Sequence, residues 1–316
     1  SGLPTGSWWP PLATAGLCSQ CSTTTPVAMF LDDSDFLDEV GSSRSPRFGE
    51  LSKLLPVVVV VATIAFLYVE YVYMHCLRLL QLDLPASARK MADVHNACVQ
   101  MAVFHVVTTL LLYCLGRCIL MHPGGIPDGG SWELRGEPEE DKREGGGVAM
   151  IETKHSGERR HCKWCLKYKP DRCHHCRVCN MCVLRMDHHC PWVYNCIGFR
   201  NYKYFFLLLV YAAMDLTIID ATMFESVWWS TRIDVSVSLM LTMLGGYCFA
   251  IFLSFCTVFF LAFHTWLMIK AMTTVEFCEK SWKNASYNSS IYSKGSTYAN
   301  ICAVLGQQPL LWLLPV

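Results

Sequence analysis

Four long apolar runs, separated by polar segments, dominate the pattern of the chain. They cover Leu54–Leu77, Ala97–Leu120, Tyr204–Trp228 and Val235–Ile269. Each run reaches the roughly 20 residues that a helix needs to cross the hydrocarbon core of a bilayer. The fourth is longer still, and we expect its excess to tilt or to project into solvent. The pattern predicts a mainly α membrane protein with four transmembrane helices.

The polar segments differ in length and character. The segment before the first run is rich in small polar residues and carries an acidic patch, which predicts a disordered tail. The segment after the second run opens with a glycine-rich, highly charged stretch typical of a flexible linker. We divide the chain into a tail (1–53), helices 1 and 2 (54–121), a linker (122–160), a cysteine-rich domain (161–203), helices 3 and 4 (204–269) and a C-terminal region (270–316).

Composition and charge agree with a membrane protein. Only 16% of the residues are charged, against about 25% in a typical soluble domain, and 53% are apolar. The formal net charge is zero, so no global field favours nucleic acid as a partner. We see no cleavable signal peptide, because the first apolar run follows a long polar stretch.

Charge also predicts the orientation in the membrane. Four spans place both ends of the chain and the segment between the second and third runs on one side. That segment carries 14 Lys and Arg, whereas the loop after the third run has only Arg232. Arg89 and Lys90, after the first run, favour the opposite orientation. The positive-inside rule favours a cytosolic central segment, in the Golgi, the endoplasmic reticulum or the plasma membrane.

Cysteine and histidine are concentrated in one short region. Eight cysteines and five histidines lie between His161 and Cys196. Repeated Cys-x-x-Cys spacing lets two thiolates reach one tetrahedral Zn²⁺, so two zinc sites are expected. The donors exceed the eight ligands of two sites, and spacing alone does not decide which residues are spare. A separate Cys18–Cys21 pair in the tail is expected to be unremarkable.

The spare residues matter because Asp187-His188-His189-Cys190 lies in this region. A cysteine left over beside an aspartate and a histidine is typical of nucleophilic catalysis, in which the histidine takes the thiol proton.

This region resembles the cysteine-rich domain of the DHHC protein S-acyltransferases (palmitoyltransferases). The resemblance rests on Cys162-x-x-Cys165, Lys169-Pro170-Asp171-Arg172, His175-Cys176-x-x-Cys179-x-x-Cys182, Arg185-Met186-Asp187-His188-His189-Cys190-Pro191-Trp192, Asn195-Cys196-Ile197-Gly198 and Asn201-Tyr202. It implies two interleaved zinc sites, one held by Cys162, Cys165, His175 and Cys182, the other by Cys176, Cys179, His189 and Cys196. Asp187, His188 and Cys190 remain for catalysis, and Cys173 and His174 are also left over.

The resemblance further implies a reaction. Cys190 attacks the thioester of a long-chain acyl-CoA such as palmitoyl-CoA, and the acyl-enzyme passes the chain to a cysteine of a membrane-associated protein. His188 acts as the base and Asp187 orients it. An acyl chain is costly to place in water, at about 0.8 kcal/mol per CH₂, so the thiol should lie at the cytosolic bilayer surface.

Other motifs of that family occur outside the cysteine-rich region. Thr273-Thr274-Val275-Glu276 matches the TTxE motif, and Thr274 is the expected partner of Asp187. Asn300 fits the asparagine of a C-terminal motif. Three positions depart from the family pattern: His122 stands in place of an aspartate, Tyr194 in place of an asparagine, and Leu305 where an aromatic residue is usual.

Two sets of polar residues stay open. Lys169, Arg172 and His174 are candidates for binding the phosphates of CoA, or they are ordinary solvated charges. Asp215 and Asp220 lie within the third run, where carboxylates are costly. We expect them to face the bundle, with Glu70, His75 or His105 as partners, and hypothesise that one of them shapes the deep end of an acyl cavity.

Two other functions fit part of the pattern. A non-enzymatic, membrane-anchored zinc scaffold would use the metal sites and leave Cys190 dispensable. A transporter would use the acids of the third run but leave the Asp-His-His-Cys sequence unexplained.

Overall fold

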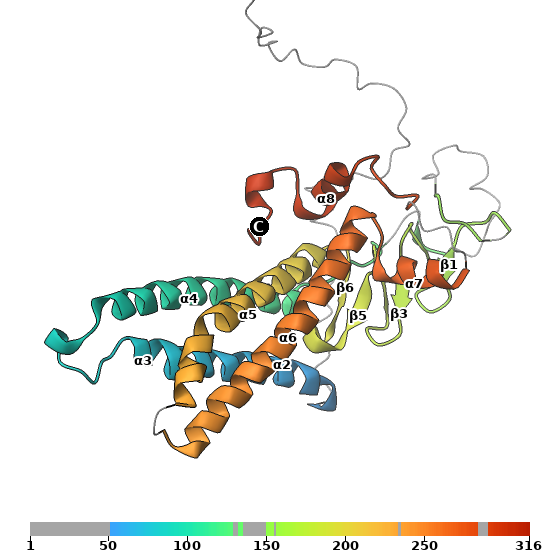
Figure 1. The fold of residues 1–316 in the computed structure, drawn as a ribbon. Helices are drawn as coiled ribbons and strands as arrows, with labels where there is room; N and C mark the ends of the chain where they lie inside the picture. The colour runs from blue at the N-terminus through green and yellow to red at the C-terminus, as the bar shows by residue number, and fades with distance from the viewer. Residues whose placement is uncertain (1–50, 129–131, 135–149, 155, 233–234, 284–289) are drawn as a thin grey trace, which may run out of the picture.

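A computed structural model describes residues 51–128, 132–134, 150–154, 156–232, 235–283 and 290–316. The predicted tail up to residue 50, with its Cys18–Cys21 pair, lies outside the described residues. Residues 135–149 of the predicted linker also lie outside them. The described chain forms a bundle of long helices with short hairpins and helices gathered at one end (Figure 1).

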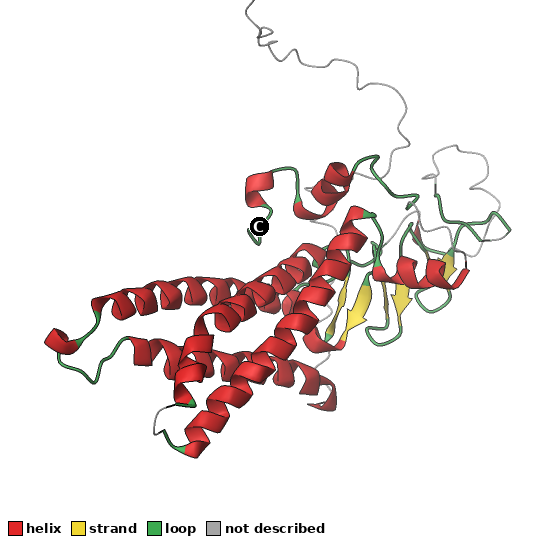
Figure 2. Ribbon diagram, in the orientation of Figure 1, coloured by secondary structure: helices red, strands yellow, loops and turns green. Residues whose placement is uncertain are grey.

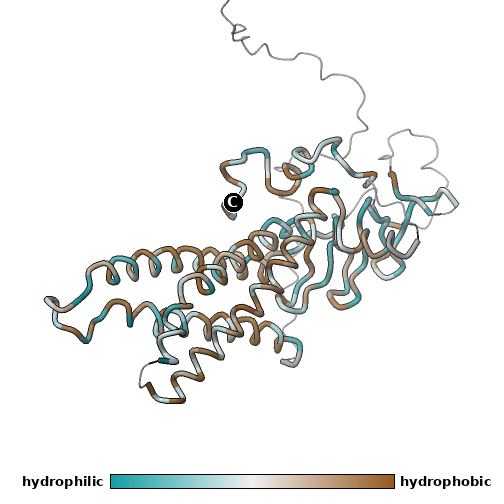
Figure 3. The backbone as a smooth tube through the Cα atoms, in the orientation of Figure 1, coloured by the Kyte–Doolittle hydropathy of each residue, from teal (hydrophilic) through white to brown (hydrophobic). Residues whose placement is uncertain are grey.

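Four helical spans among the described residues are long and apolar enough to cross a membrane, which confirms the expected architecture. The first span combines α2 (Leu51–Val69), the π-helical segment η1 (Glu70–Cys76) and α3 (Leu77–Leu79). After the short 3₁₀ turn η2 (Ala86–Ala88), the others are α4 (Met91–Leu120), α5 (Tyr202–Ser230) and α6 (Val237–Ile269). Apolar residues line these helices along most of their length (Figure 3).

The ends of the spans reflect local chemistry rather than hydropathy. α4 begins at Met91, before the apolar run that starts at Ala97, because a helix continues readily through polar residues outside the bilayer core. α6 begins after Ser236, whose hydroxyl accepts a hydrogen bond from the backbone N–H of Leu239 at 3.4 Å. A serine in this position satisfies one of the N–H groups that a helix start leaves unpaired.

The first span changes from an α-helix to a π-helix at η1, and this segment carries buried polar residues. His75 is fully buried between the hydroxyl of Ser226 (2.7 Å) and the side-chain oxygen of Gln100 (2.9 Å). The buried carboxyl group of Glu70 lies against Gly246 of α6, where a Cβ atom would stand 3.1 Å from the carboxyl carbon. Gly246 therefore allows α6 to pack closely against the first span.

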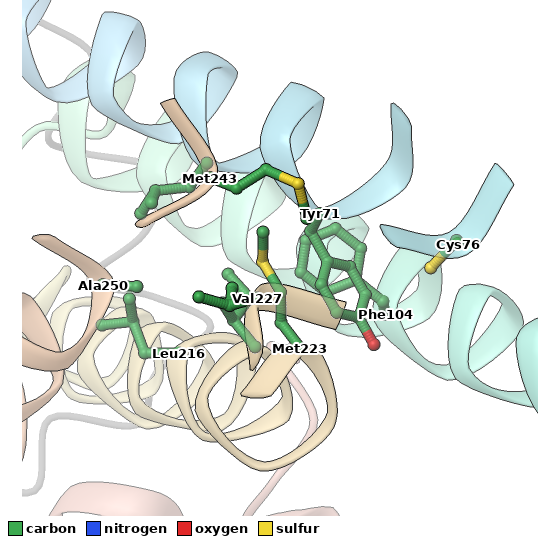
Figure 4. Packing of buried hydrophobic residues seen from close by; sticks show 10 residues of the cluster. Tyr71, Cys76, Phe104, Leu216, Met223, Val227, Met243 and Ala250 are labelled. Atoms are coloured by element: carbon green, nitrogen blue, oxygen red, sulfur yellow. The ribbon is translucent and has the colours of Figure 1, made fainter. Parts of the chain in front are cut away.

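One apolar core joins the four spans (Figure 4). It contains Leu67, Tyr71, Cys76, Phe104, Leu216, Ile219, Met223, Val227, Met243 and Ala250. The rings of Tyr71 and Phe104 lie 4.5 Å apart between centroids. The hydroxyl of Tyr71 is hydrogen-bonded to Thr222 of α5 at 2.8 Å, so the polar atom of this buried ring is satisfied.

The acids of α5 do not pair as the sequence suggested. Asp215 is buried and accepts a hydrogen bond from Thr108 of α4 at 3.0 Å. His75 bonds elsewhere, as described above, and His105 is hydrogen-bonded to Tyr68 at 2.8 Å. None of the three suggested partners, Glu70, His75 or His105, is the donor to Asp215, because a threonine one helix away supplies it. The hydropathy pattern does not indicate that the hydroxyl of Thr108 faces Asp215.

Within the described part of the segment between α4 and α5, the strands form three antiparallel hairpins (Figure 2). They pair β1 (His161–Cys162) with β2 (Lys167–Tyr168), β3 (His174–Cys176) with β4 (Met181–Val183), and β5 (His188–Cys190) with β6 (Asn195–Ile197). A 3₁₀ turn, η4 (Pro191–Val193), connects the last two strands. Strands this short are marginal by themselves, so other interactions must hold the hairpins in place.

The described parts of the predicted linker pack onto these hairpins. Gly125 forms a bridge with Val183 of β4, and the N–H of Leu184 donates to the carbonyl of Gly124 at 3.0 Å. Thr153 forms a bridge with Arg159, before β1. The folded region around the hairpins thus includes residues on the N-terminal side of His161.

Asparagine side chains fasten the third hairpin to the membrane helices. The amide of Asn195 donates to the carbonyl of Cys118 at 2.9 Å, near the end of α4 where helix carbonyls lack partners. Asn201, fully buried before α5, accepts from the N–H of Gly198 and donates to the carbonyl of Cys196, both at 2.9 Å. The hairpin is therefore fixed relative to the ends of two spans.

In the described residues after α6, three short helical segments follow. They are α7 (Thr274–Lys283), α8 (Thr297–Leu305) and the 3₁₀ turn η5 (Pro309–Leu311). α7 and α8 lie at the same end of the bundle as the hairpins (Figure 1).

Gly198 provides a test of this packing. A Cβ atom there would lie 2.6 Å from a methyl group of Val183 and 3.0 Å from the carbonyl oxygens of Leu184 and Pro123. We expect Gly198→Ala to destabilise the protein by about 1–3 kcal/mol, because backbone atoms cannot move aside cheaply. Thermal unfolding in detergent measures the effect. Gly116→Ala is the control, since the described residues leave open space there, and equal midpoints for both variants would contradict the expectation.

Candidate active site

The three hairpins repeat one pattern of residues in one register. His161 pairs with Tyr168, His175 with Cys182, and His189 with Cys196 across the strands. The repeated units are His161-Cys162-x-x-Cys165-x-x-Tyr168, His175-Cys176-x-x-Cys179-x-x-Cys182 and His189-Cys190-x-x-Val193-x-x-Cys196. Most of the crowded cysteines and histidines thus occupy the same few positions of a hairpin that occurs three times, and Cys173, His174 and His188 lie outside these positions.

The register sorts the donors into two metal groups. Successive side chains of a strand point to opposite faces, so His175 and its neighbour Cys176 serve different sites. The first metal group is Cys162, Cys165, His175 and Cys182, and the second metal group is Cys176, Cys179, His189 and Cys196. In each group the four donor atoms lie within 4.8 Å of one another. These are the sets that the family resemblance implied.

Each metal group links two hairpins. The Cys-x-x-Cys turn of one hairpin supplies two thiols, and the cross-strand His–Cys pair of the next hairpin supplies the remaining two donors. The second hairpin therefore takes part in both groups. A chain of hairpins joined in this way needs little apolar core, because the metal ions would bind the strands together.

The Cys-x-x-Cys turns have the local geometry of metal-binding turns. The N–H groups of Cys165 and Cys179 point at the sulfurs of Cys162 and Cys176, at 3.5 and 3.3 Å. The next residue in each turn, Leu166 or Asn180, adopts a positive φ, which tightens the turn. Three thiolates and one imidazole, two of the four buried in each group, suit a closed tetrahedral Zn²⁺ site with no open position for catalysis.

Cys190 occupies a metal-ligand position in the third hairpin without belonging to either group. It corresponds to Cys176 of the second hairpin, but Val193 stands where Cys179 would supply the second thiol. Cys190 is 6% exposed and packs in an apolar cluster with Cys118 of α4 and Phe205 of α5. The repeat thus presents one cysteine, free of metal, at the ends of the membrane helices.

Asp187 and His188 lie beside this thiol. Nδ1 of His188 is 2.7 Å from Oδ2 of Asp187. Because a carboxylate can only accept, Nδ1 carries the proton, and the other ring nitrogen is available to Cys190. Oδ1 of Asp187 accepts from the backbone N–H of Thr274 at 2.9 Å, and Oδ2 accepts from the Thr274 hydroxyl at 2.8 Å. The predicted contact between Thr274 and Asp187 is therefore present.

These contacts determine the charges of the pair. Burial raises the pKa of Asp187, but the hydrogen bond and charge of His188, with the N–H of Thr274, outweigh burial and hold that pKa below its ordinary value. Burial lowers the pKa of His188, but hydrogen bonds to Asp187 and Cys190 outweigh it and raise the pKa to about 9. The surroundings thus stabilise the imidazolium that forms when His188 takes the thiol proton.

The start of α7 is held by an ion pair that the sequence did not reveal. Glu276 is buried and binds Arg172 through both carboxylate oxygens, one contact measuring 2.9 Å. Glu276 also accepts from the N–H of Thr273 at 3.1 Å, and the Thr273 hydroxyl accepts from the N–H of Glu276 at 3.3 Å. This reciprocal cap fixes the first turn of α7, and with it Thr274.

The three candidate phosphate-binding residues differ in their surroundings. Arg172 is held by Glu276. His174 lies 3.8 Å from Glu279, and burial lowers its pKa. The backbone of Lys169 is hydrogen-bonded to Arg160, and its side chain is half-buried.

The other predicted positions have structural roles. Asn300 is buried and donates to the carbonyl of Ile269 at 2.9 Å, which ties α8 to the end of α6. Leu305 packs on Phe206 in a further apolar cluster. Nδ1 of His122 accepts from the N–H of Gly124 at 3.2 Å, a contact that an aspartate would also make. Burial, and then the charge of Arg200, lower the pKa of His122, which keeps that nitrogen available.

Comparison with known proteins gives consistent results. A sequence model of the family described as DHHC palmitoyltransferase matches residues 155–281. The palmitoyltransferase ZDHHC2 of Danio rerio is 38% identical over 166 residues, which cover 51% of this chain and 45% of that protein. The probable protein S-acyltransferase 13 of Arabidopsis thaliana is 33% identical over 221 residues, which cover 68% of this chain and 71% of that protein.

Human palmitoyltransferase ZDHHC15 is 38% identical over 165 residues, which cover 51% of this chain and 48% of that protein. The chain thus spans about half the length of the animal relatives and more than two thirds of the plant relative.

Removal of one ligand should empty a metal group. We expect Cys182→Ala to lower the zinc bound per chain from two to at most one, because three donors no longer close the first site. Elemental analysis of purified protein gives the count. The control is Cys173→Ala, a buried thiol of the same region outside both groups, which should keep two zinc ions. Two zinc ions in Cys182→Ala would contradict the ligand set.

Proposed function

The chain belongs to the DHHC palmitoyltransferase family, and from that membership we propose that it is a protein S-acyltransferase that forms an acyl-enzyme on Cys190. The observation that carries this proposal is the position of the thiol: outside both metal groups, hydrogen-bonded to His188, and packed against the ends of membrane helices. A nucleophile, a base and an orienting carboxylate are thereby brought together.

The proposed reaction has two balanced steps. His188 takes the thiol proton of Cys190, and the sulfur attacks the carbonyl carbon of the acyl-CoA thioester. The bond to the CoA sulfur breaks, and CoA leaves as a thiol with the proton returned by His188. A cysteine of the protein substrate then attacks the acyl-enzyme in the same way and releases the Cys190 thiol. Zinc in this scheme supplies structure, since both groups are closed by four protein donors.

The surroundings of Cys190 favour a lipid substrate. A cavity of about 410 Å³ lies between α2 and α4, lined by residues such as Ile64, Tyr68 and Thr108. Ile64 also packs on the apolar cluster that contains Cys190. We propose that the acyl chain, of palmitoyl length, extends from Cys190 toward this cavity. Thr108 connects the cavity wall to Asp215, which fits the hypothesis that this acid bounds the deep end.

The head of acyl-CoA needs cations near the hairpins. Arg172 is committed to Glu276 and holds α7 in place. Of the three residues predicted for this role, Lys169 remains as a cation, and His174, whose pKa is lowered by burial, remains as a neutral hydrogen-bond donor. We keep the predicted orientation, with the hairpins, α7 and α8 in the cytosol, where the protein substrates are membrane-associated proteins with accessible cysteines.

A matched pair of variants tests the nucleophile. Wild-type protein incubated with a fluorescent acyl-CoA should acquire a label that neutral hydroxylamine removes, as expected for a thioester. Cys190→Ser should lose this label, whereas Cys173→Ser should keep it, because that thiol lies outside the proposed chemistry. If the hydroxylamine-sensitive label persists in Cys190→Ser, the proposed nucleophile is wrong and the zinc-scaffold function becomes the better explanation.

The hydroxyl of Thr274 should contribute to the rate. We expect Thr274→Val to slow acyl-enzyme formation by about tenfold or more, because the buried, charged carboxylate of Asp187 loses the hydrogen bond from the Thr274 hydroxyl. Thr265→Val is a matched control, since that hydroxyl donates only to a carbonyl of its own helix. Single-turnover labelling compares the two variants, and equal rates would show that the backbone N–H of Thr274 holds Asp187 by itself.

A further inference from the structure

A second histidine, His264 of α6, lies against the catalytic pair. The centroid of its ring is 6.0 Å from that of His188, and both rings pack on the edge of Phe205 at 5.0 and 5.1 Å. Neither the metal groups nor the proposed proton transfer uses His264. Its position next to the reacting groups nevertheless makes it part of their surroundings.

The environment of His264 is one that favours an apolar residue. The side chain is 1% exposed and is surrounded by the rings of Phe205, Phe260 and Phe263, with centroids at 5.0, 4.6 and 5.5 Å. A phenylalanine would fill such an aromatic cage without burying any polar atom. The imidazole therefore requires an explanation other than packing.

Only one of its two nitrogens is satisfied. Nδ1 lies 3.3 Å from the hydroxyl of Tyr202, whereas Nε2 has no hydrogen-bond partner among the described residues. When the Tyr202 hydroxyl donates to Nδ1, Nε2 carries the ring proton and is a buried donor without an acceptor. Such a group destabilises the resting protein, so its partner is expected to arrive during the reaction.

The nearby groups of the resting protein are bonded to other donors. Oδ1 of Asp187 accepts from the backbone N–H of Thr274, and Oδ2 accepts from the Thr274 hydroxyl and from His188. Nε2 of His264 bonds to neither oxygen. His188 uses its second nitrogen toward Cys190. The acceptor that the reaction brings to this place is the carbonyl oxygen of the acyl thioester, which gains negative charge when the Cys190 sulfur attacks the carbonyl carbon.

We propose that Nε2 of His264 donates a hydrogen bond to this oxygen and stabilises the tetrahedral intermediate. The inference rests on the proposed acyltransferase function. The electron pair of the carbonyl moves onto the oxygen as the sulfur–carbon bond forms, and returns as the bond to CoA breaks. The same donor serves the second step, because the acyl carbonyl stays in place while the substrate thiol replaces CoA. A preorganised donor in a largely buried site is effective for this purpose.

The decisive variant is His264→Phe, because it fits the aromatic cage and removes only the polar atoms. We expect single-turnover formation of the acyl-enzyme to slow by about 100-fold, with little change in KM for palmitoyl-CoA. The thermal unfolding midpoint should stay close to that of the wild type, because the loss of the unpaired Nε2–H offsets the loss of the partner of the Tyr202 hydroxyl. His264→Gln, which restores an N–H donor, should recover part of the rate. His95→Phe makes the same change at an exposed position and should leave the rate unchanged.

The possible outcomes distinguish a failure of the proposed role of His264 from a failure of the proposed acyltransferase function. A wild-type rate for His264→Phe, with Cys190→Ser unlabelled, overturns the role of His264 alone. A slow His264→Phe that also unfolds earlier, and that Gln does not improve, overturns it in favour of a packing role. A label that persists in Cys190→Ser overturns the acyl-enzyme itself.

Discussion

The sharing of metal ligands between consecutive hairpins is the constraint on which the rest of the structure depends. The strands are only two or three residues long, and the apolar clusters around them consist largely of the ligand cysteines themselves. Without metal ions, little would fix one hairpin relative to the next. With them, the third hairpin is tied through the second to the first, and Cys190 takes its position from that assembly.

The membrane helices complete what the metal groups begin. Asn195 attaches the third hairpin to the end of α4, and the first turn of α7, held by Arg172 and Glu276, delivers two hydrogen bonds to Asp187. The reactive pair is thus supported from two sides by elements far apart in the sequence. Both attachments use backbone groups at helix ends, because the N–H groups at the start of a helix and the C=O groups at its end have no partner within the helix and can bond to side chains.

Sequence alone predicted the features that have a local signature. Apolar runs predicted the four spans, because the bilayer demands length and hydropathy of each helix separately. The family resemblance named ligand sets that the structure brings together. By contrast, the π-helical segment with Glu70, the partner of Asp215 and the ion pair of Arg172 depend on contacts between distant segments, which no local pattern encodes. The position of His264 beside His188 could not be predicted for the same reason, because a single histidine in an apolar run gives no indication of which residues it contacts.

The repeated hairpin has a consequence for how such a site can arise. Cys190 stands in the place of a zinc ligand, in a unit that shares its histidine and its final cysteine with the second hairpin. The proposed nucleophile therefore uses a position that the hairpin already offers to a metal ion. Two features leave this thiol without metal: Val193 supplies no second sulfur, and the chain continues from β6 into α5, so no further hairpin follows directly to contribute a histidine and a cysteine. The free thiol is, on that account, a ligand position at which the series of hairpins stops.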